Sequence, residues 1–228
     1  MTATTATAAG AASLFEALSR PRRKRAFHPF GAGFAASFAP APSQRIGVPT
    51  LEGEHGAVVR LSRSLGLPEP LPDPCGVALR LSDAHGEGRH QDFLFASSAR
   101  APLARHALLP SRGFADRPLS TLLPYRVGGR LTLFSVRVLG AAGPGPKLAD
   151  LRERSLGELE LELSAAGLVG GWRPIATIAL GARLPPDETE QLRFDPTNTG
   201  GGLELAGLLN RLRGPSYAGS QAGRRAVG

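Results

Sequence analysis

Ala57-Val-Val-Arg-Leu-Ser62, followed by Asp73-Pro-Cys-Gly76 and Val77-Ala-Leu-Arg-Leu81, is the stretch of sequence that decides the fold. In the first segment Arg60 and Ser62 alternate with apolar residues, which is the period of a β-strand with one face turned to a core. The second segment has the composition of a turn, and the third is strand-like again. The stretch therefore predicts consecutive strands of a meander rather than a βαβ unit.

Further strands are predicted on both sides of this pair, at Gly33–Phe38, His90–Ala96, Arg130–Leu139, Leu156–Leu163 and Trp172–Leu180. Helical turns are predicted near Leu103–Leu109, at Ser120–Pro124, Pro185–Leu192 and Leu203–Leu212, and from Pro215 onward. About seven or eight short, mostly antiparallel strands with added helices are typical of a barrel. We therefore expect an α+β fold that is mainly an antiparallel β-barrel with inserted and C-terminal helices.

The length of 228 residues suffices for one domain with a full core. We expect residues 1–24 to form a flexible N-terminal arm with a short helix and a basic run, and residues 25–228 to form the barrel domain. No uninterrupted apolar window reaches ~18 residues and no secretory signal opens the chain, so a cytoplasmic protein without a transmembrane segment is expected. The single cysteine, Cys75, excludes an internal disulfide and fits a reducing compartment.

The net charge is +8 and is carried almost entirely by arginine. Such a balance favours anionic partners, among them nucleic acid, anionic lipid and carboxylate-bearing ligands. The basic run Arg20–Arg25 is typical of a solvated linker, so nucleic acid is not an expected partner.

Two constellations of polar residues lie at opposite ends of the chain. The first is Arg25-Ala-Phe-His28-Pro-Phe-Gly31-Ala-Gly33, in which an arginine and a histidine three residues apart precede a Gly-Ala-Gly step. The second consists of Arg213, Tyr217 and Arg224, which follow Phe194-Asp-Pro196. A barrel scaffold between them can bring the two constellations face to face.

Taken in order, these motifs resemble the catalase superfamily. The first constellation is similar to the stretch that carries the distal histidine, and Ala57–Ser62 with Asp73–Leu81 is similar to the family's Val-Arg-Phe-Ser and Asp-Pro-Arg-Gly-Phe-Ala strand pair. The spacing of Arg213, Tyr217 and Arg224 is similar to that of the proximal tyrosine helix. The resemblance covers roughly residues 25–225 and implies a haem between the barrel and a C-terminal helix.

The resemblance also implies roles for individual residues. Tyr217 would be the axial ligand of the haem iron, as tyrosine is in catalase. His28 would be the distal acid–base group, with Ser62 as the partner that orients it. The cofactor-binding arginines would be Arg25, Arg60, Arg213 and Arg224.

The sequence departs from the family pattern at two places. Where the family has a distal asparagine, this chain offers only the serines of Ala96-Ser-Ser98. Gly214-Pro215 separates Arg213 from Tyr217 and favours a helix start after Arg213. Without the amide, the expected chemistry is the reduction of a peroxide with an organic donor, or the rearrangement of an organic hydroperoxide, with only weak dismutation.

Two other functions remain open from the sequence. One is a haem-free barrel that binds an apolar or anionic ligand, and the other is a phosphodiester hydrolase. His85, His90 and Asp92 form the only loose group of candidate metal ligands, and neither a Gly-x-Ser-x-Gly elbow nor a phosphate-binding Gly-rich loop occurs. We expect a monomer or a homodimer.

Overall fold

The structure, a computed structural model, describes residues 30–42, 45–68, 71–102, 104–140, 145–153 and 159–207. Its strands are β1 (Phe30–Pro40), β2 (His55–Arg63), β3 (Cys75–Leu81), β4 (Gln91–Ser97), β5 (Leu119–Ser120), β6 (Tyr125–Val127), β7 (Arg130–Val138), β8 (Glu160–Gly167), β9 (Arg173–Arg183) and β10 (Leu203–Leu205). Its helices are the α-helices α2 (Leu148–Glu153) and α3 (Pro186–Gln191) and the 3-10 turns η1 (Pro49–Leu51) and η2 (Ala104–His106). No helix within these ranges is long and apolar enough to cross a membrane.

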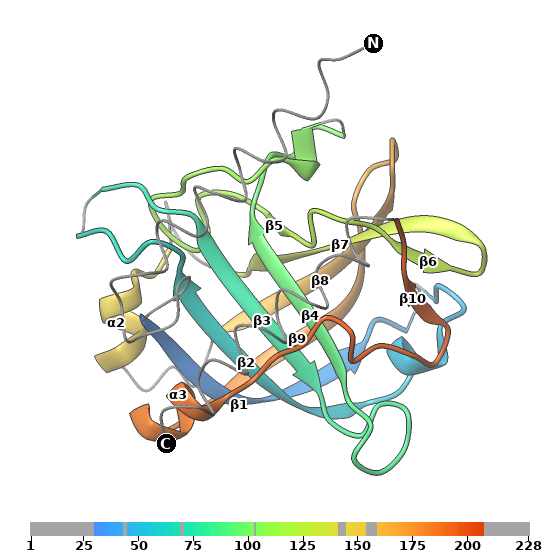
Figure 1. The fold of residues 1–228 in the computed structure, drawn as a ribbon, viewed down its shortest axis with the longest axis horizontal. Helices are drawn as coiled ribbons and strands as arrows, with labels where there is room; N and C mark the ends of the chain where they lie inside the picture. The colour runs from blue at the N-terminus through green and yellow to red at the C-terminus, as the bar shows by residue number, and fades with distance from the viewer. Residues whose placement is uncertain are drawn as a thin grey trace, which may run out of the picture.

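The described strands form an antiparallel barrel (Figure 1). Its eight strands follow one another as β7-β5-β4-β3-β2-β1-β9-β8, and the pairing of β7 with β8 closes the ring. Strands β6 and β10 extend the sheet beyond β7. The predicted antiparallel barrel is confirmed, and the described chain is mostly β with few helices.

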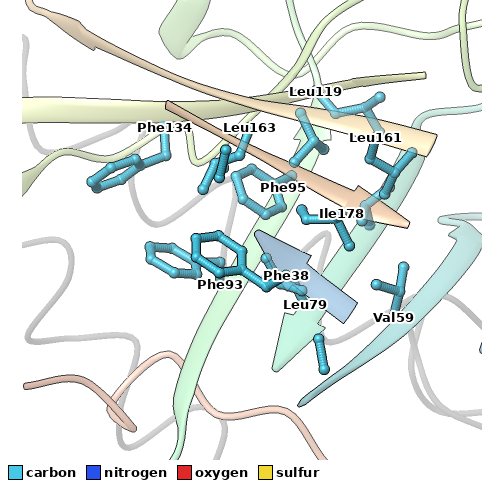
Figure 2. Close-up of a cluster of buried hydrophobic side chains, with 14 of the residues drawn as sticks. Phe38, Val59, Leu79, Phe93, Phe95, Leu119, Phe134, Leu161, Leu163 and Ile178 are labelled. Atoms are coloured by element: carbon cyan, nitrogen blue, oxygen red, sulfur yellow. The ribbon is translucent and has the colours of Figure 1, made fainter. Parts of the chain in front are cut away.

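Alternation along each strand fills the barrel with apolar side chains (Figure 2). Val59 and Leu61 of β2 point inward, as the sequence pattern predicts, and Phe93 and Phe95 of β4 do the same. The short helix α2 adds Leu151 to this core. The buried aromatic rings and branched side chains leave the outward faces of the strands to build any polar site.

The structure corrects two of the predicted helices. Ser120 belongs to strand β5, which pairs with β4 and β7, so Ser120–Pro124 is not a helical turn. Leu203–Leu205 forms strand β10 against β6, where the sequence predicts the start of a helix. The helix at Pro185–Leu192 is confirmed as α3, within one residue at each end. The N-terminal arm and the helix predicted from Pro215 lie outside the described residues.

The connection between β4 and β5 is fastened by a buried arginine. Arg105 in η2 is only 1% exposed and donates hydrogen bonds to the carbonyl oxygens of Gly167 (3.1 Å) and Gly170 (2.8 Å) in the β8–β9 hairpin. Its guanidinium carbon also lies 4.5 Å from the ring centroid of Trp172. Burial lowers the pKa of Arg105, and among the described residues no carboxylate offsets that burial. Carbonyl dipoles and the aromatic face therefore hold the cation.

Candidate functional site

The outward face of β1 and β2 carries a buried arginine and a buried serine. Strand register places Gly31 opposite Ser62 and Gly33 opposite Arg60. Arg60 and Ser62 are each only 4% exposed, although both point away from the apolar core. A buried cation on the outside of a barrel marks this face as more than a solvated surface.

Glycine is required where β1 meets the guanidinium group of Arg60. A Cβ atom at Gly31 would lie 2.7 Å from the Cζ and Nη2 atoms of Arg60 and 2.8 Å from Nε. A Cβ atom at Gly33 would lie 2.6 Å from Oγ1 of Thr189, which brings α3 onto the same face. The Gly-Ala-Gly step therefore lets an arginine and a helix approach the backbone of one strand.

Small residues continue this face across the neighbouring strands. Gly76 of β3 lies opposite Ser62, and Ala96 of β4 lies opposite Gly76. With Gly31 they form a row of four small residues around the outside of the barrel. Such a row leaves a smooth strip of backbone that a flat group can approach closely.

The two serines that replace the expected asparagine are used elsewhere. Ser97 accepts a hydrogen bond from the backbone amide of Cys75 (3.1 Å) and donates to the carbonyl oxygen of Leu109. The Ser98 hydroxyl donates to the carbonyl oxygen of Pro118 over 3.4 Å. Both side chains are fully buried and fasten the long connection to the barrel. Neither hydroxyl therefore takes the place of an amide aimed at a ligand.

A second polar centre, which sequence reasoning missed, is built around Asp92. This fully buried carboxylate accepts two hydrogen bonds from Arg80, from Nε at 2.7 Å and from Nη2 at 2.6 Å. It also accepts the backbone amide of Asp195 (2.8 Å) and the side-chain amide of Asn198 (3.0 Å). The guanidinium of Arg80 lies over the ring of Phe194, 5.3 Å from its centroid. Arg80 and Asp92 are cross-strand partners of β3 and β4. The sequence could have indicated this pair only if the register of the hairpin had been predicted.

Asp92 and its neighbours hold the segment that leads toward the C-terminal residues. Gln91 accepts a hydrogen bond from the backbone amide of Gly200 (3.3 Å), and Thr50 donates to the carbonyl oxygen of Gly201 (3.3 Å). Nδ1 of His85 lies 3.0 Å from Oγ1 of Thr50. The stretch from Phe194 to Gly201 is thus fastened along the barrel before the chain reaches Tyr217.

The loose metal cluster suggested by the sequence is not assembled. His85 contacts Thr50, Asp92 binds Arg80, and Nδ1 of His90 accepts the backbone amide of Asp83. No group of three or more His, Cys, Asp or Glu side chains in the described ranges is arranged to hold a metal ion. The described part of the chain therefore gives no support to metal-dependent hydrolysis.

The protonation of His85 should make the stability of the protein depend on pH. Burial, with smaller contributions from the nearby charges of Arg89 and His55, lowers the pKa of His85 below its ordinary value of 6.5. The unfolded chain therefore binds the proton more readily, so stability is complete above pH 6.5 and decreases as the pH falls toward the lowered value. Because the imidazole is partly exposed, we expect an effect below about 1 kcal/mol.

Urea unfolding of the wild type and of His85→Gln over this pH range measures the effect. The difference in stability between the two proteins should change with pH, whereas His106→Gln, at an exposed histidine, should follow the wild type. A constant difference between wild type and His85→Gln would contradict the assignment.

Of the site residues predicted from the sequence, the structure describes Arg60 and Ser62. It places them on one face of β2, as the strand pattern predicts, and it also places Gly31 beside them. The other predicted site residues lie outside the described residues: Arg25, His28, Arg213, Tyr217 and Arg224.

Comparison with known proteins finds similarity in the fold alone. No family model matches the sequence, and no curated protein matches it. Among solved structures, catalase A from Saccharomyces cerevisiae superposes with a TM-score of 0.65 at 12% identity, over 91% of this chain and 62% of that one. A fungal catalase gives 0.61 at 13% identity, over 90% and 60%, and a bacterial catalase gives 0.62 at 12%, over 96% and 60%.

These values show that the chain has a catalase-like fold. It spans about three fifths of the length of the catalases that it matches.

Proposed function

We propose that this chain is a haem-binding, catalase-like oxidoreductase that acts on peroxide or organic hydroperoxides. The observation that carries the proposal is the guanidinium of Arg60, which is buried on the outward face of the barrel against Gly31. A fixed, forked cation in such a position suits a carboxylate, and haem carries two carboxylates as propionates.

The residues of this face fit a flat, anionic group. Ser62, Gly76 and Ala96 lie next to Gly31 around the barrel and present no bulky side chain. Arginine forms bidentate contacts with carboxylates, and here the lack of a Cβ at Gly31 sets where the guanidinium rests. The catalase-like fold supports the same face of the barrel as the distal side.

Each residue has a defined part in the proposal. When bound, haem supplies the redox chemistry of its iron. Tyr217 would hold the iron through its phenolate, and His28 would accept a proton from the hydroperoxide and return it to the oxygen that leaves. Ser62 positions His28, since it pairs with Gly31 only three residues farther along the chain. The carboxylates are held by Arg60 together with Arg25, Arg213 and Arg224.

The anchored serines favour one kind of chemistry over another. Because Ser97 and Ser98 bond backbone carbonyls, neither replaces the amide that helps to orient peroxide. We therefore propose reduction of a hydroperoxide with an organic donor, or its rearrangement, ahead of fast dismutation.

Titration of the purified protein with hemin tests the proposal. A saturable visible band at one haem per chain is expected, and Tyr217→Phe should abolish it. Arg60→Met should weaken haem affinity roughly 10- to 100-fold, because it removes one charge-assisted contact. Gly31→Ala should weaken it too, since the added methyl displaces the guanidinium without removing its charge.

Arg137→Met is the matched control, because Arg137 lies exposed on the outer surface of β7 and pairs with Glu162. It should bind haem as the wild type does. Equal haem affinities of Arg60→Met and the wild type would show that this face of the barrel does not bind haem. No saturable uptake at all would favour the haem-free, ligand-binding alternative.

A further inference from the structure

The β8–β9 hairpin presents apolar side chains to solvent in a fixed conformation. Val169 is 78% exposed and Leu168 is 39% exposed, both at the tip of the hairpin. They lie between Gly167 and Gly170, whose carbonyl oxygens are both bound by the guanidinium of Arg105. A buried cation thus holds in place a loop that exposes two hydrophobic side chains, where a loose polar turn would have sufficed.

Neighbouring segments add cations to the same end of the barrel. Arg105 fastens η2 to the hairpin, and Figure 1 shows the green turn of η2 and the orange hairpin along the upper edge of the molecule. The β6–β7 turn also lies beside the hairpin, because Thr132 pairs with Gly167. The exposed arginines in these segments or within four residues of them along the chain are Arg100, Arg126, Arg130 and Arg173.

No acidic residue balances these arginines within their own segments. Residues 99–115, 117–149 and 163–186 contain neither aspartate nor glutamate. Across the pairing of β10 with β6, Glu204 lies opposite Arg126 and offsets part of this positive charge, while the net charge of +8 on the whole chain keeps the overall field positive. The surface thus combines a protruding apolar tip with a surrounding group of arginines.

We propose that this end of the barrel, defined by Leu168 and Val169 with the four exposed arginines, docks on an anionic lipid surface. The apolar tip enters the boundary between headgroups and acyl chains, and the arginines contact the lipid phosphates. A bilayer suits the shape, because a convex tip of two side chains buries far less area than a stable protein interface needs. Nucleic acid would use the arginines and leave Val169 without a role.

Trp172 makes the docking directly observable. It is the only tryptophan in the chain and lies three residues from Val169, with its ring against Arg105. Entry of the hairpin tip into a less polar environment should shift its emission to the blue. The signal requires neither haem nor activity, so it is independent of the proposed function.

The experiment mixes the full chain with vesicles of phosphatidylcholine alone or with added phosphatidylglycerol, and records flotation and tryptophan emission. We expect binding to the anionic vesicles only, weakened by salt. Val169→Asp should reduce that binding at least about ten-fold, since it removes apolar contact and adds a repelled charge. Arg173→Gln should reduce it by a smaller factor.

Leu71→Asp is the matched control, because Leu71 is 53% exposed in the connection between β2 and β3. It should bind vesicles as the wild type does, and thermal unfolding should show all three variants folded. Equal binding by Val169→Asp and wild type would overturn the proposal and assign the attraction to charge alone. Equal binding to neutral and anionic vesicles, or none to either, would overturn it as well.

Discussion

Replacing Asp92 with alanine is expected to lower the free energy of unfolding by about 3 kcal/mol. The substitution removes four hydrogen bonds, two from Arg80 and one each from Asp195 and Asn198. The side chain of Arg80 is 22% exposed, so water can solvate part of the guanidinium once Asp92 is removed. The loss of stability should therefore lie at the lower end of the range for breaking a buried ion pair. Urea unfolding measures it directly, and the midpoint of thermal unfolding should decrease by roughly 6–12 °C.

Glu162→Ala is the control for this substitution. Glu162 also pairs with an arginine on an adjacent strand, but its partner Arg137 is 52% exposed, so the loss should be under about 1 kcal/mol. A similar loss of unfolding free energy for the two variants would mean that the buried Asp92 pair contributes no more to stability than an exposed pair does. Under the proposed function, Asp92→Ala should also weaken hemin uptake, because it releases the segment that leads to Tyr217.

Replacing Phe93 with alanine is expected to lower the free energy of unfolding by about 4 kcal/mol. Phe93 is fully buried, and its ring lies 5.2 Å from Phe134 and 5.5 Å from Tyr125 between ring centroids. Truncation removes the contacts of a ring that reaches across the barrel from β4 to β6 and β7 and leaves a cavity that the rigid strands cannot close. Leu94→Ala, on the half-exposed outward side of the same strand, should lose less than about half as much.

Labelling of Cys75, the only cysteine, measures the loss of stability in Phe93→Ala without denaturant. Cys75 is 2% exposed, and burial raises the pKa of its thiol from 9.0 to about 12, so the folded protein should react slowly with thiol reagents. Labelling then follows the opened population, which a loss of about 4 kcal/mol raises roughly 10³-fold. Labelling of Phe93→Ala at the wild-type rate would show that the site repacks.

Most of the barrel could be predicted from the sequence because its strands each bury one face. The alternation around Arg60 and Ser62 assigns the inward and outward sides of β2 correctly. Cys75 and Gly76, predicted as part of a turn, instead begin β3 and pair with Arg63 and Ser62. Leu203 and Leu205 misled the same reasoning, because leucines spaced through a short segment also fit a helix. Pairing with β6, a contact between segments more than 70 residues apart, decides the matter in favour of a strand.

The candidate site was predictable in its residue types but not in its contacts. The sequence identifies Arg60 and Ser62 as outward-facing polar residues. The approach of the guanidinium to Gly31 depends on how β1 and β2 are aligned, and this alignment is set across the loop at residues 41–54. The buried positions of Asp92 and Arg105 depend on long-range packing, which no local pattern encodes.

The pairing of β1 with β9 has a consequence for the synthesis of the protein. Strand β1 ends at Pro40, whereas its partner on one side is complete only at Arg183. At translation rates of about 5–20 residues per second, roughly 7–30 s pass between the synthesis of Pro40 and that of Arg183, and only then can β9 pair with β1. During that time an apolar strand with free backbone groups is open to other chains. Chaperones that hold nascent chains should therefore raise the soluble yield more than added stability of the folded protein does.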